Sequence, residues 1–169
     1  MINYFDFFEI NEAFSIDEGA LRKSFILNSR KYHPDFHTLS DEASQEQVLE
    51  LSTINNDGYN VLKDRFKRMQ HLLTIKNKMP EEGQAQVPQE FLMEMMDINE
   101  ALMELEFDAS VAAKEKVLTD IADLEKTLHQ EGQNAMDAWD EDHEDSFLDL
   151  IVDYYLKMKY IIRIKERIQ

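Results

Sequence analysis

Tyr32-His33-Pro34-Asp35 stands between two stretches of sequence that have the periodicity of α-helices. In the first stretch, Leu21, Phe25 and Tyr32 recur at helical spacing after Asp17, a residue type that often caps a helix N-terminus. Pro34 disfavours the α conformation at the residue before it, so we expect this helix to end at Tyr32. The four residues are therefore predicted to form a stiff surface loop between two helices.

The second helix is predicted to start near Ser40-Asp41-Glu42 and to reach Leu62. Gly58 lies inside its apolar stripe, where glycine costs about 1 kcal/mol relative to alanine. We therefore expect another helix or an aromatic ring to approach the backbone closely at Gly58. The aromatic opening Tyr4-Phe5-Asp6-Phe7-Phe8 is expected to pack onto this helix pair, and a short helix around Arg65–Ile75 to close the unit.

A polar stretch bracketed by Pro80 and Pro88 is the best candidate for a linker. We predict a first domain at residues 1–76, a linker at 77–87 and a second domain at 88–169. Three helical stretches follow the linker, with a turn expected around Gly132, and they suggest an up-down-up bundle. These stretches are 88–106, 109–130 and 145–168. The predicted fold class is all-α.

Composition excludes several classes of function. The net charge of −17 argues against nucleic-acid binding, which requires clustered basic residues. The charge is also uneven, at −2 for residues 1–79 and −15 for residues 80–169, which indicates two segments with different electrostatic roles. No apolar run is long enough to cross a membrane, no secretory signal is evident, and the absence of cysteine fits a reducing compartment. We expect a cytoplasmic protein without a cofactor.

The helix before the loop is basic on its non-core side, although the whole chain is strongly acidic. Its basic residues form two pairs two turns apart, which are Arg22 with Lys23 and Arg30 with Lys31. Such a face is typical of a docking surface for an acidic partner. The tripeptide His33-Pro34-Asp35 alone is common by chance and most often marks an ordinary turn. Its combination with the basic helix is more informative.

The basic helix, Tyr-His-Pro-Asp and the following Ile54-Asn55-x-x-x-Tyr59-x-x-Leu62 pattern together resemble the J domain over about residues 1–75. The resemblance implies that His33, Pro34 and Asp35 trigger ATP hydrolysis by a DnaK-type chaperone and that the basic face docks onto it. The chain itself would then catalyse no reaction. Two positions depart from the usual J-domain pattern: Asp64 is followed by Arg65 rather than proline, and Phe36 stands where lysine is common.

The helix that follows the linker carries more apolar residues than one buried face requires. Phe91, Met95, Ile98, Leu102 and Leu105 form one stripe, and Leu92, Met96 and Met103 form a second, with Met93 beside it. A methionine-rich second stripe is typical of an adaptable protein-binding patch. The alternative is that the bundle or the first domain covers both stripes.

Phe91-Leu92-Met93-Glu94-Met95-Met96 and the Tyr4-Phe5-Asp6-Phe7-Phe8 opening are similar to segments of the HscB family of J proteins, which serve iron–sulfur cluster assembly. The resemblance implies a DnaK/HscA-type chaperone and the scaffold protein IscU as partners. It also implies a set of scaffold-binding residues on this helix, with one aromatic residue on the last helix. These are Leu92, Met93, Met96, Asp97, Glu100, Glu104 and Tyr155. The zinc-binding variant of the family is excluded because it requires cysteines.

Two alternatives remain open. The chain is a J-domain protein with a different client on its acidic bundle, or it is a small metal-dependent hydrolase with His33, Asp35 and His37 as ligands. The i,i+4 spacing of the two histidines suits a metal pair, but Pro34 between them disfavours a shared helix face. The acidic run at residues 137–149 lacks the glycine and ligand spacing of a calcium loop, so we interpret it as a solvated helix connection.

Overall fold

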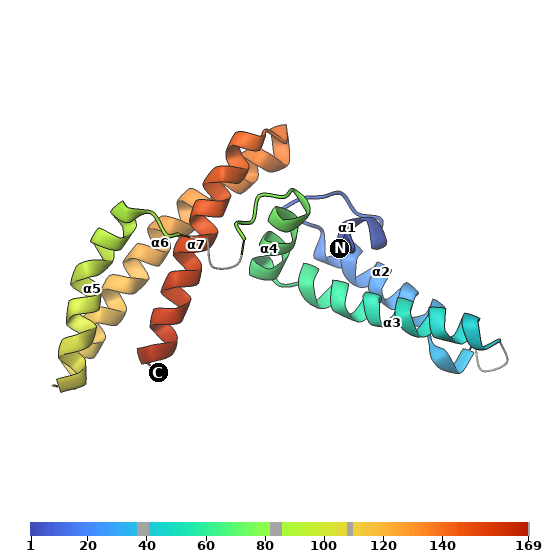
Figure 1. The fold of residues 1–169 in the computed structure, drawn as a ribbon, viewed down its shortest axis with the longest axis horizontal. Coiled ribbons are helices and arrows are strands. Elements are labelled where there is room, and N and C mark those ends of the chain that lie inside the picture. The colour runs from blue at the N-terminus through green and yellow to red at the C-terminus, as the bar shows by residue number, and fades with distance from the viewer. Residues whose placement is uncertain (37–40, 82–85, 108–109, 169) are drawn as a thin grey trace. The chain divides into compact units, whose positions relative to one another are not determined.

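The computed structural model describes residues 1–36, 41–81, 86–107 and 110–168. This part of the chain contains seven α-helices, one short 3-10 helix and no strand, which confirms the predicted all-α class (Figure 1). The elements are α1 (Tyr4–Phe7), α2 (Glu18–Lys31), η1 (Pro34–Phe36), α3 (Glu42–Leu62), α4 (Arg65–Ile75), α5 (Gln89–Phe107), α6 (Val111–Asp142) and α7 (Asp145–Ile168).

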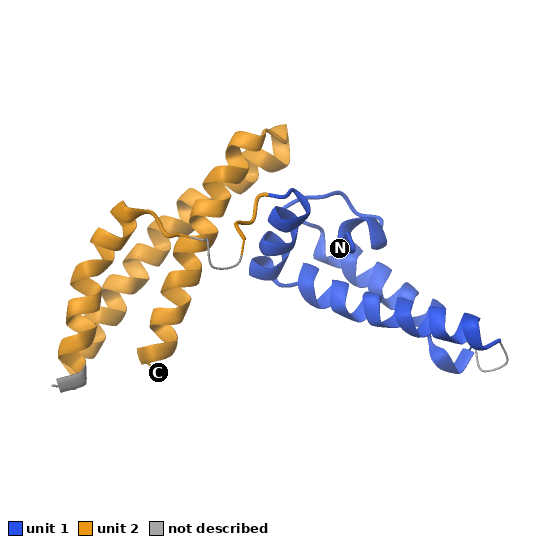
Figure 2. Cartoon of the chain, in the orientation of Figure 1, with its two compact units in different colours: residues 1–77 blue, residues 78–169 orange. Residues whose placement is uncertain are grey.

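The helices fall into two compact units, Met1–Asn77 and Lys78–Gln169 (Figure 2). Unit 1 contains α1 to α4, and unit 2 contains α5 to α7. In the described ranges, every helix is too short or too polar to cross a lipid bilayer.

Unit 1 is built on the hairpin of α2 and α3, whose ends lie where the sequence predicts them. The Asp17 carboxylate caps α2 by accepting a hydrogen bond of 2.9 Å from Ala20 N, and the helix ends with Tyr32 as its C-cap. Asp41 caps α3 in the same way, 3.0 Å from Ser44 N. The rings of Phe25 and Tyr59 stack across the hairpin with centroids 4.1 Å apart.

The aromatic opening of the chain packs against α3 at Gly58, as predicted. Phe5 and Phe8 are fully buried, and a Cβ placed on Gly58 would lie 2.7 Å from Tyr4 Cδ1 and 2.9 Å from Phe8 Cε2. These distances are shorter than any normal carbon–carbon contact, so only glycine lets the two rings lie directly on the α3 backbone. The loss of helix propensity at this position is offset by close packing.

Gly58→Ala is expected to destabilise unit 1 by about 1–2 kcal/mol, because overpacking a rigid core costs more than the helix propensity gained. Urea unfolding measured by circular dichroism would test this. Asn60→Ala is the control: it also raises helix propensity, at an exposed position of α3, and should not destabilise the protein. Equal stability of the two variants would contradict the packing argument.

Asp64 explains why this chain does not need a proline after α3. Its carboxylate accepts hydrogen bonds of 3.0 Å from both Phe66 N and Lys67 N, and it is the N-cap of α4. The carboxylate of an N-cap residue marks the start of the next helix, so the boundary between α3 and α4 does not require a proline. The departure at Asp64-Arg65 therefore leaves the fold of unit 1 unchanged.

His71 joins the aromatic opening to α4. Its Nε2 atom accepts a hydrogen bond of 3.1 Å from the backbone amide of Tyr4, and its ring lies 4.7 Å from the Tyr4 ring. An accepting Nε2 requires the neutral imidazole. Burial lowers the pKa of His71, and the nearby Glu12 carboxylate opposes this only in part.

Unit 1 is therefore expected to lose stability as the pH falls from about 7 to about 5. His71 has a lower pKa in the folded state than in the unfolded state, so the unfolded chain takes up its proton first and is favoured as the pH falls through its ordinary value. The measurement is urea unfolding followed by the NMR signals of unit 1. The slope between these pH values should be smaller for His71→Gln, and an unchanged slope would contradict the assignment.

Unit 2 is a three-helix bundle in which α6 is longer than predicted. Instead of turning near Gly132, α6 continues to Asp142, and the chain reverses at His143, whose φ of 54° is left-handed. Gly132 is buried inside the helix, and a Cβ placed on it would lie 2.6 Å from the Tyr154 ring of α7. The glycine permits a close helix crossing rather than a turn, so the predicted turn and the predicted end of the helix near residue 130 are wrong.

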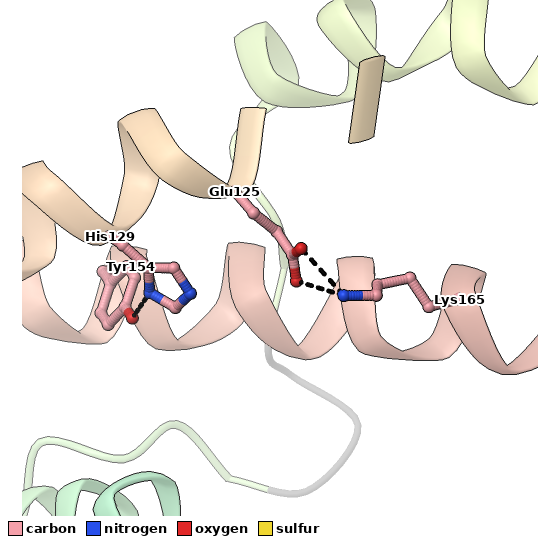
Figure 3. A network of polar contacts seen from close by, with 4 residues as sticks. All are labelled: Glu125, His129, Tyr154 and Lys165. Atoms are coloured by element: carbon pink, nitrogen blue, oxygen red, sulfur yellow. Dashed lines mark hydrogen bonds and ion pairs between the residues drawn. The ribbon is translucent and has the colours of Figure 1, made fainter. Parts of the chain in front are cut away.

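Two polar contacts join α6 to α7 (Figure 3). The ammonium of Lys165 lies 2.9 and 2.8 Å from the two carboxylate oxygens of Glu125, and His129 Nδ1 lies 2.6 Å from the Tyr154 hydroxyl oxygen. Partly exposed contacts of this kind contribute little to stability, about 1 kcal/mol or less each. Their geometric effect is to fix how far α7 can slide along α6.

Candidate functional site

The loop after α2 is ordered by a local hydrogen bond. Residues 34–36 form the 3-10 turn η1, and Asp35 N donates to His33 Nδ1 at 3.2 Å. Because Nδ1 accepts this bond, the neutral imidazole carries its proton on Nε2, which is then a hydrogen-bond donor. The side chains of His33 and Asp35 are 51% and 85% exposed. A partner can therefore contact both the imidazole and the carboxylate directly.

Phe36 adds an apolar group to the same loop. Its side chain is 75% exposed, and its ring centroid lies 5.5 Å from that of His33. The sequence singled out this position only as a departure from the J-domain pattern. The sequence did contain a signal for its exposure: an aromatic residue directly follows a loop-forming Pro-Asp, and a short turn cannot bury a large side chain.

The four basic residues of α2 are all exposed, as the helical spacing predicts. Arg30 and Lys31 occupy the last turn, where cations interact favourably with the helix dipole, and the Lys31 ammonium lies 5.1 Å from the Tyr32 ring centroid. In the part of the chain that the structure describes, no ion pair within 4.0 Å involves Arg22, Lys23 or Arg30. This face, with the loop at its end, is a surface of positive charge available to a partner.

Two apolar residues of this face were missed by the sequence analysis. Ile26 and Leu27 are 41% and 56% exposed, and each lies one turn from a basic residue on either side. Their signal in the sequence was an apolar pair placed midway between two basic pairs. The face therefore offers apolar contact as well as charge.

The methionine-rich stripe of α5 is exposed. The side chains of Met93, Met96 and Met103 are 64%, 65% and 61% exposed, and Leu92 is 40% exposed. The buried stripe of the same helix consists of Phe91, Met95, Ile98 and Leu102. The alternative in which the bundle covers both stripes is therefore wrong. Asp97, Glu100 and Glu104 are exposed beside the methionines, and the result is an apolar strip with an acidic border.

The rotation of α5 about its own axis is fixed by its packing on α6 and by contacts with α7. Asn99 Nδ2 donates to the Tyr160 hydroxyl oxygen at 3.1 Å, and the Phe91 ring meets the Tyr160 ring edge-on at 5.8 Å. Asn99 also donates to Met95 O at 2.8 Å, so its side chain is held at both its own helix and the neighbouring one. With the packing on α6, these contacts keep the Phe91 stripe buried and the methionine stripe outward.

Tyr155 is buried, unlike the other predicted scaffold-binding residues. It is 2% exposed in the core of unit 2, and burial raises the pKa of its hydroxyl group. A side chain with so little exposed surface offers a partner almost no direct contact. The exposed face of α5 instead brings together Leu92, Met93, Met96, Asp97, Glu100 and Glu104, with Met103 as an additional member.

Among the described residues, no set of metal ligands supports the hydrolase alternative. Within the described ranges, no group of three or more His, Asp or Glu side chains is arranged to hold a metal ion, and His37 lies outside these ranges.

The acidic run at residues 137–149 spans the end of α6 and the start of α7. Lys78 pairs there with Asp149 at 3.0 Å and with Asp145 at 3.8 Å.

Comparison with known proteins gives consistent matches. Residues 87–169 match the family model of the HSCB C-terminal oligomerisation domain. The chain is 27% identical to the human iron–sulfur cluster co-chaperone protein HscB, over 99% of this chain and 67% of the human protein. It is also 27% identical to a co-chaperone protein HscB homolog of Vibrio cholerae, over 99% of this chain and 95% of the relative.

Solved structures agree over nearly the whole chain. The crystal structure of human co-chaperone protein HscB superposes with a TM-score of 0.75 at 27% identity, covering 99% of this chain and 81% of the human one. Chaperone HscB from Vibrio cholerae gives a TM-score of 0.78 at 25% identity, covering 98% and 95%. The likeness therefore extends over both units.

Proposed function

The chain belongs to the HscB family of iron–sulfur cluster co-chaperones, and from this premise we propose that its two exposed surfaces divide the work between a chaperone and a scaffold protein. The protein is a co-chaperone in iron–sulfur cluster assembly and not an enzyme. Membership of the family implies an Hsp70-type chaperone as partner. We propose IscU as the scaffold protein, and we propose which residues contact each partner.

Unit 1 is the proposed J domain, and the loop that ends its basic helix is the proposed trigger. The observation that carries this is the exposed His33-Pro34-Asp35 turn, held by the bond from Asp35 N to His33 Nδ1. Arg22, Lys23, Arg30 and Lys31 would steer this turn onto an acidic surface of the ATP-loaded chaperone. The turn then presents a donor at Nε2 and a carboxylate to the chaperone, where ATP is hydrolysed.

Unit 2 carries the proposed scaffold-binding face on α5. Exposed methionines bordered by carboxylates suit a partner with an apolar patch and basic residues around it, because methionine adapts to irregular apolar surfaces. The assignment of IscU as this partner rests on the HscB-like Phe-Leu-Met-Glu segment at residues 91–94. The contacts with Tyr160 keep the face turned outward.

The proposed order of events rests on the resemblance to the HscB family, with one step for each of the two surfaces. The scaffold protein binds the α5 face, the basic helix brings the loop to the ATP-loaded chaperone, and hydrolysis leaves the scaffold bound by the chaperone. The cytoplasm is the proposed location, supported by the absence of cysteine.

ATPase measurements on a purified DnaK/HscA-type chaperone, with and without IscU, test the whole proposal. The chain is expected to stimulate hydrolysis, and IscU is expected to increase this stimulation further. Stimulation by the chain with no effect of IscU would favour a different client on unit 2. No stimulation of a chaperone that responds to another J protein in the same assay would overturn the assignment of unit 1.

A further inference from the structure

The exposed methionines of α5 have a chemical property that goes beyond their apolar surface. A thioether is readily oxidised to the sulfoxide, and the chain has no cysteine that would react in its place. The sulfoxide is polar and chiral, whereas the thioether is apolar and flexible. Oxidation would therefore change the part of α5 that a partner contacts.

The methionines divide into two groups by exposure. Four of them, Met69, Met95, Met136 and Met158, are at most 4% exposed and lie in the cores of the two units. Met93, Met96 and Met103 are 61–65% exposed and share one face of α5. Met1 is also exposed, at 89%, and Met79 is half-buried. An oxidant in solution therefore meets the proposed scaffold-binding face long before it reaches either core.

We propose that Met93, Met96 and Met103 are sites of oxidative modification that control binding of the scaffold protein. The inference rests on the proposed function of α5. A peroxide transfers one oxygen atom to the thioether sulfur: the sulfur–oxygen bond forms, the oxygen–oxygen bond breaks, and the sulfur loses two electrons. The peroxide is reduced to water, or to an alcohol if it is an organic peroxide. The backbone and the buried stripe of α5 stay as they are.

The acidic border makes the sulfoxide harder to accommodate. A sulfoxide oxygen is a hydrogen-bond acceptor, and the side chains beside the methionines at Asp97, Glu100 and Glu104 are carboxylates, which are acceptors as well. None of these three can donate to the new oxygen when ionised. A partner shaped for an apolar strip would bury the sulfoxide without a donor, which costs on the order of tenfold in affinity.

The test treats the full chain with hydrogen peroxide, maps oxidised methionines by mass spectrometry of proteolytic peptides, and measures IscU affinity by calorimetry. Met93, Met96 and Met103 are expected to oxidise well before the four buried methionines. The Kd for IscU is expected to rise about tenfold or more. Methionine sulfoxide reductases, which reduce the sulfoxide back to the thioether, are expected to restore the original value.

The matched variant is Met93→Leu/Met96→Leu/Met103→Leu, which keeps the apolar volume and removes the sulfur. The Kd of this variant for IscU is expected to be nearly the same before and after peroxide treatment. Met1 is oxidised in the variant as it is in the natural chain, so this comparison isolates the effect of the three α5 methionines. Prior oxidation of buried methionines, an unchanged Kd after oxidation of the α5 face, or a loss of affinity that reductase does not reverse would each overturn the proposal. Absence of IscU binding before treatment would overturn the proposed scaffold contact itself and, with it, the control proposed here.

Discussion

His33→Gln is expected to reduce stimulation of the chaperone ATPase by about thirtyfold or more, because a central interface residue contributes about 2 kcal/mol or more to an interaction. The imidazole Nδ1 accepts the bond from Asp35 N and leaves the Nε2 proton free for the partner. Glutamine carries one carbonyl oxygen and one amide nitrogen at the end of a flexible side chain, so it does not reproduce both contacts of the rigid imidazole ring. The measurement is single-turnover hydrolysis by the chaperone at increasing co-chaperone concentration.

The same variant shows whether a loss of stimulation comes from the loop itself or from unfolding of unit 1. The His33 side chain is 51% exposed, so His33→Gln is expected to keep the unfolding transition and the affinity for IscU. His129→Gln is the matched control, since it makes the same replacement at an exposed position of unit 2 and should keep full stimulation. Normal stimulation by His33→Gln would remove the loop from the proposed mechanism.

Leu92→Ala/Met96→Ala is expected to weaken IscU binding by about 2 kcal/mol, or roughly thirtyfold, because both side chains lose apolar contact with the partner. The two residues are adjacent on the outward face of α5 and are 40% and 65% exposed. Both side chains are at least 40% exposed, so the stability of the bundle is expected to change less than the affinity for IscU. Calorimetric titration with IscU gives the affinity directly.

Leu118→Ala provides the control for this second prediction. Leu118 is also 40% exposed but lies on α6, so its truncation removes a similar apolar surface elsewhere in the same unit. It is expected to leave IscU affinity unchanged. Equal affinity of the double variant and the natural chain would show that the α5 face is not where IscU binds, while leaving the role of unit 1 intact.

The elements of unit 1 could be predicted from sequence because each one is marked by local chemistry. Asp17, Asp41 and Pro34 set the ends of α2 and α3, and the close approach of Tyr4 and Phe8 to Gly58 follows from the cost of glycine in a helix. These signals act within a few residues of the feature that they determine. The outward orientation of the basic face also followed from helical spacing alone.

Unit 2 was harder to predict because its decisive features are contacts between distant residues. Gly132 was interpreted as a turn, since glycine often interrupts helices, whereas Tyr154 of α7 determines its role. The second stripe of α5 could equally have been covered, and packing against α6 together with the contacts of Asn99 and Phe91 with Tyr160 decides which side faces outward. Periodicity identifies two stripes but cannot say which neighbour covers either.

The link between Asn99 and Tyr160 has a thermodynamic consequence for recognition. A helix clamped against its neighbour by a hydrogen bond and an edge-on ring contact has little rotational freedom to lose when it meets a partner. The entropic cost of association is therefore limited to the exposed side chains, chiefly the rotamers of the methionines. Tyr160→Phe would remove the hydrogen bond to Asn99 and keep the ring contact, so it would loosen one of the restraints on α5 and make its exposed face less preformed for a partner.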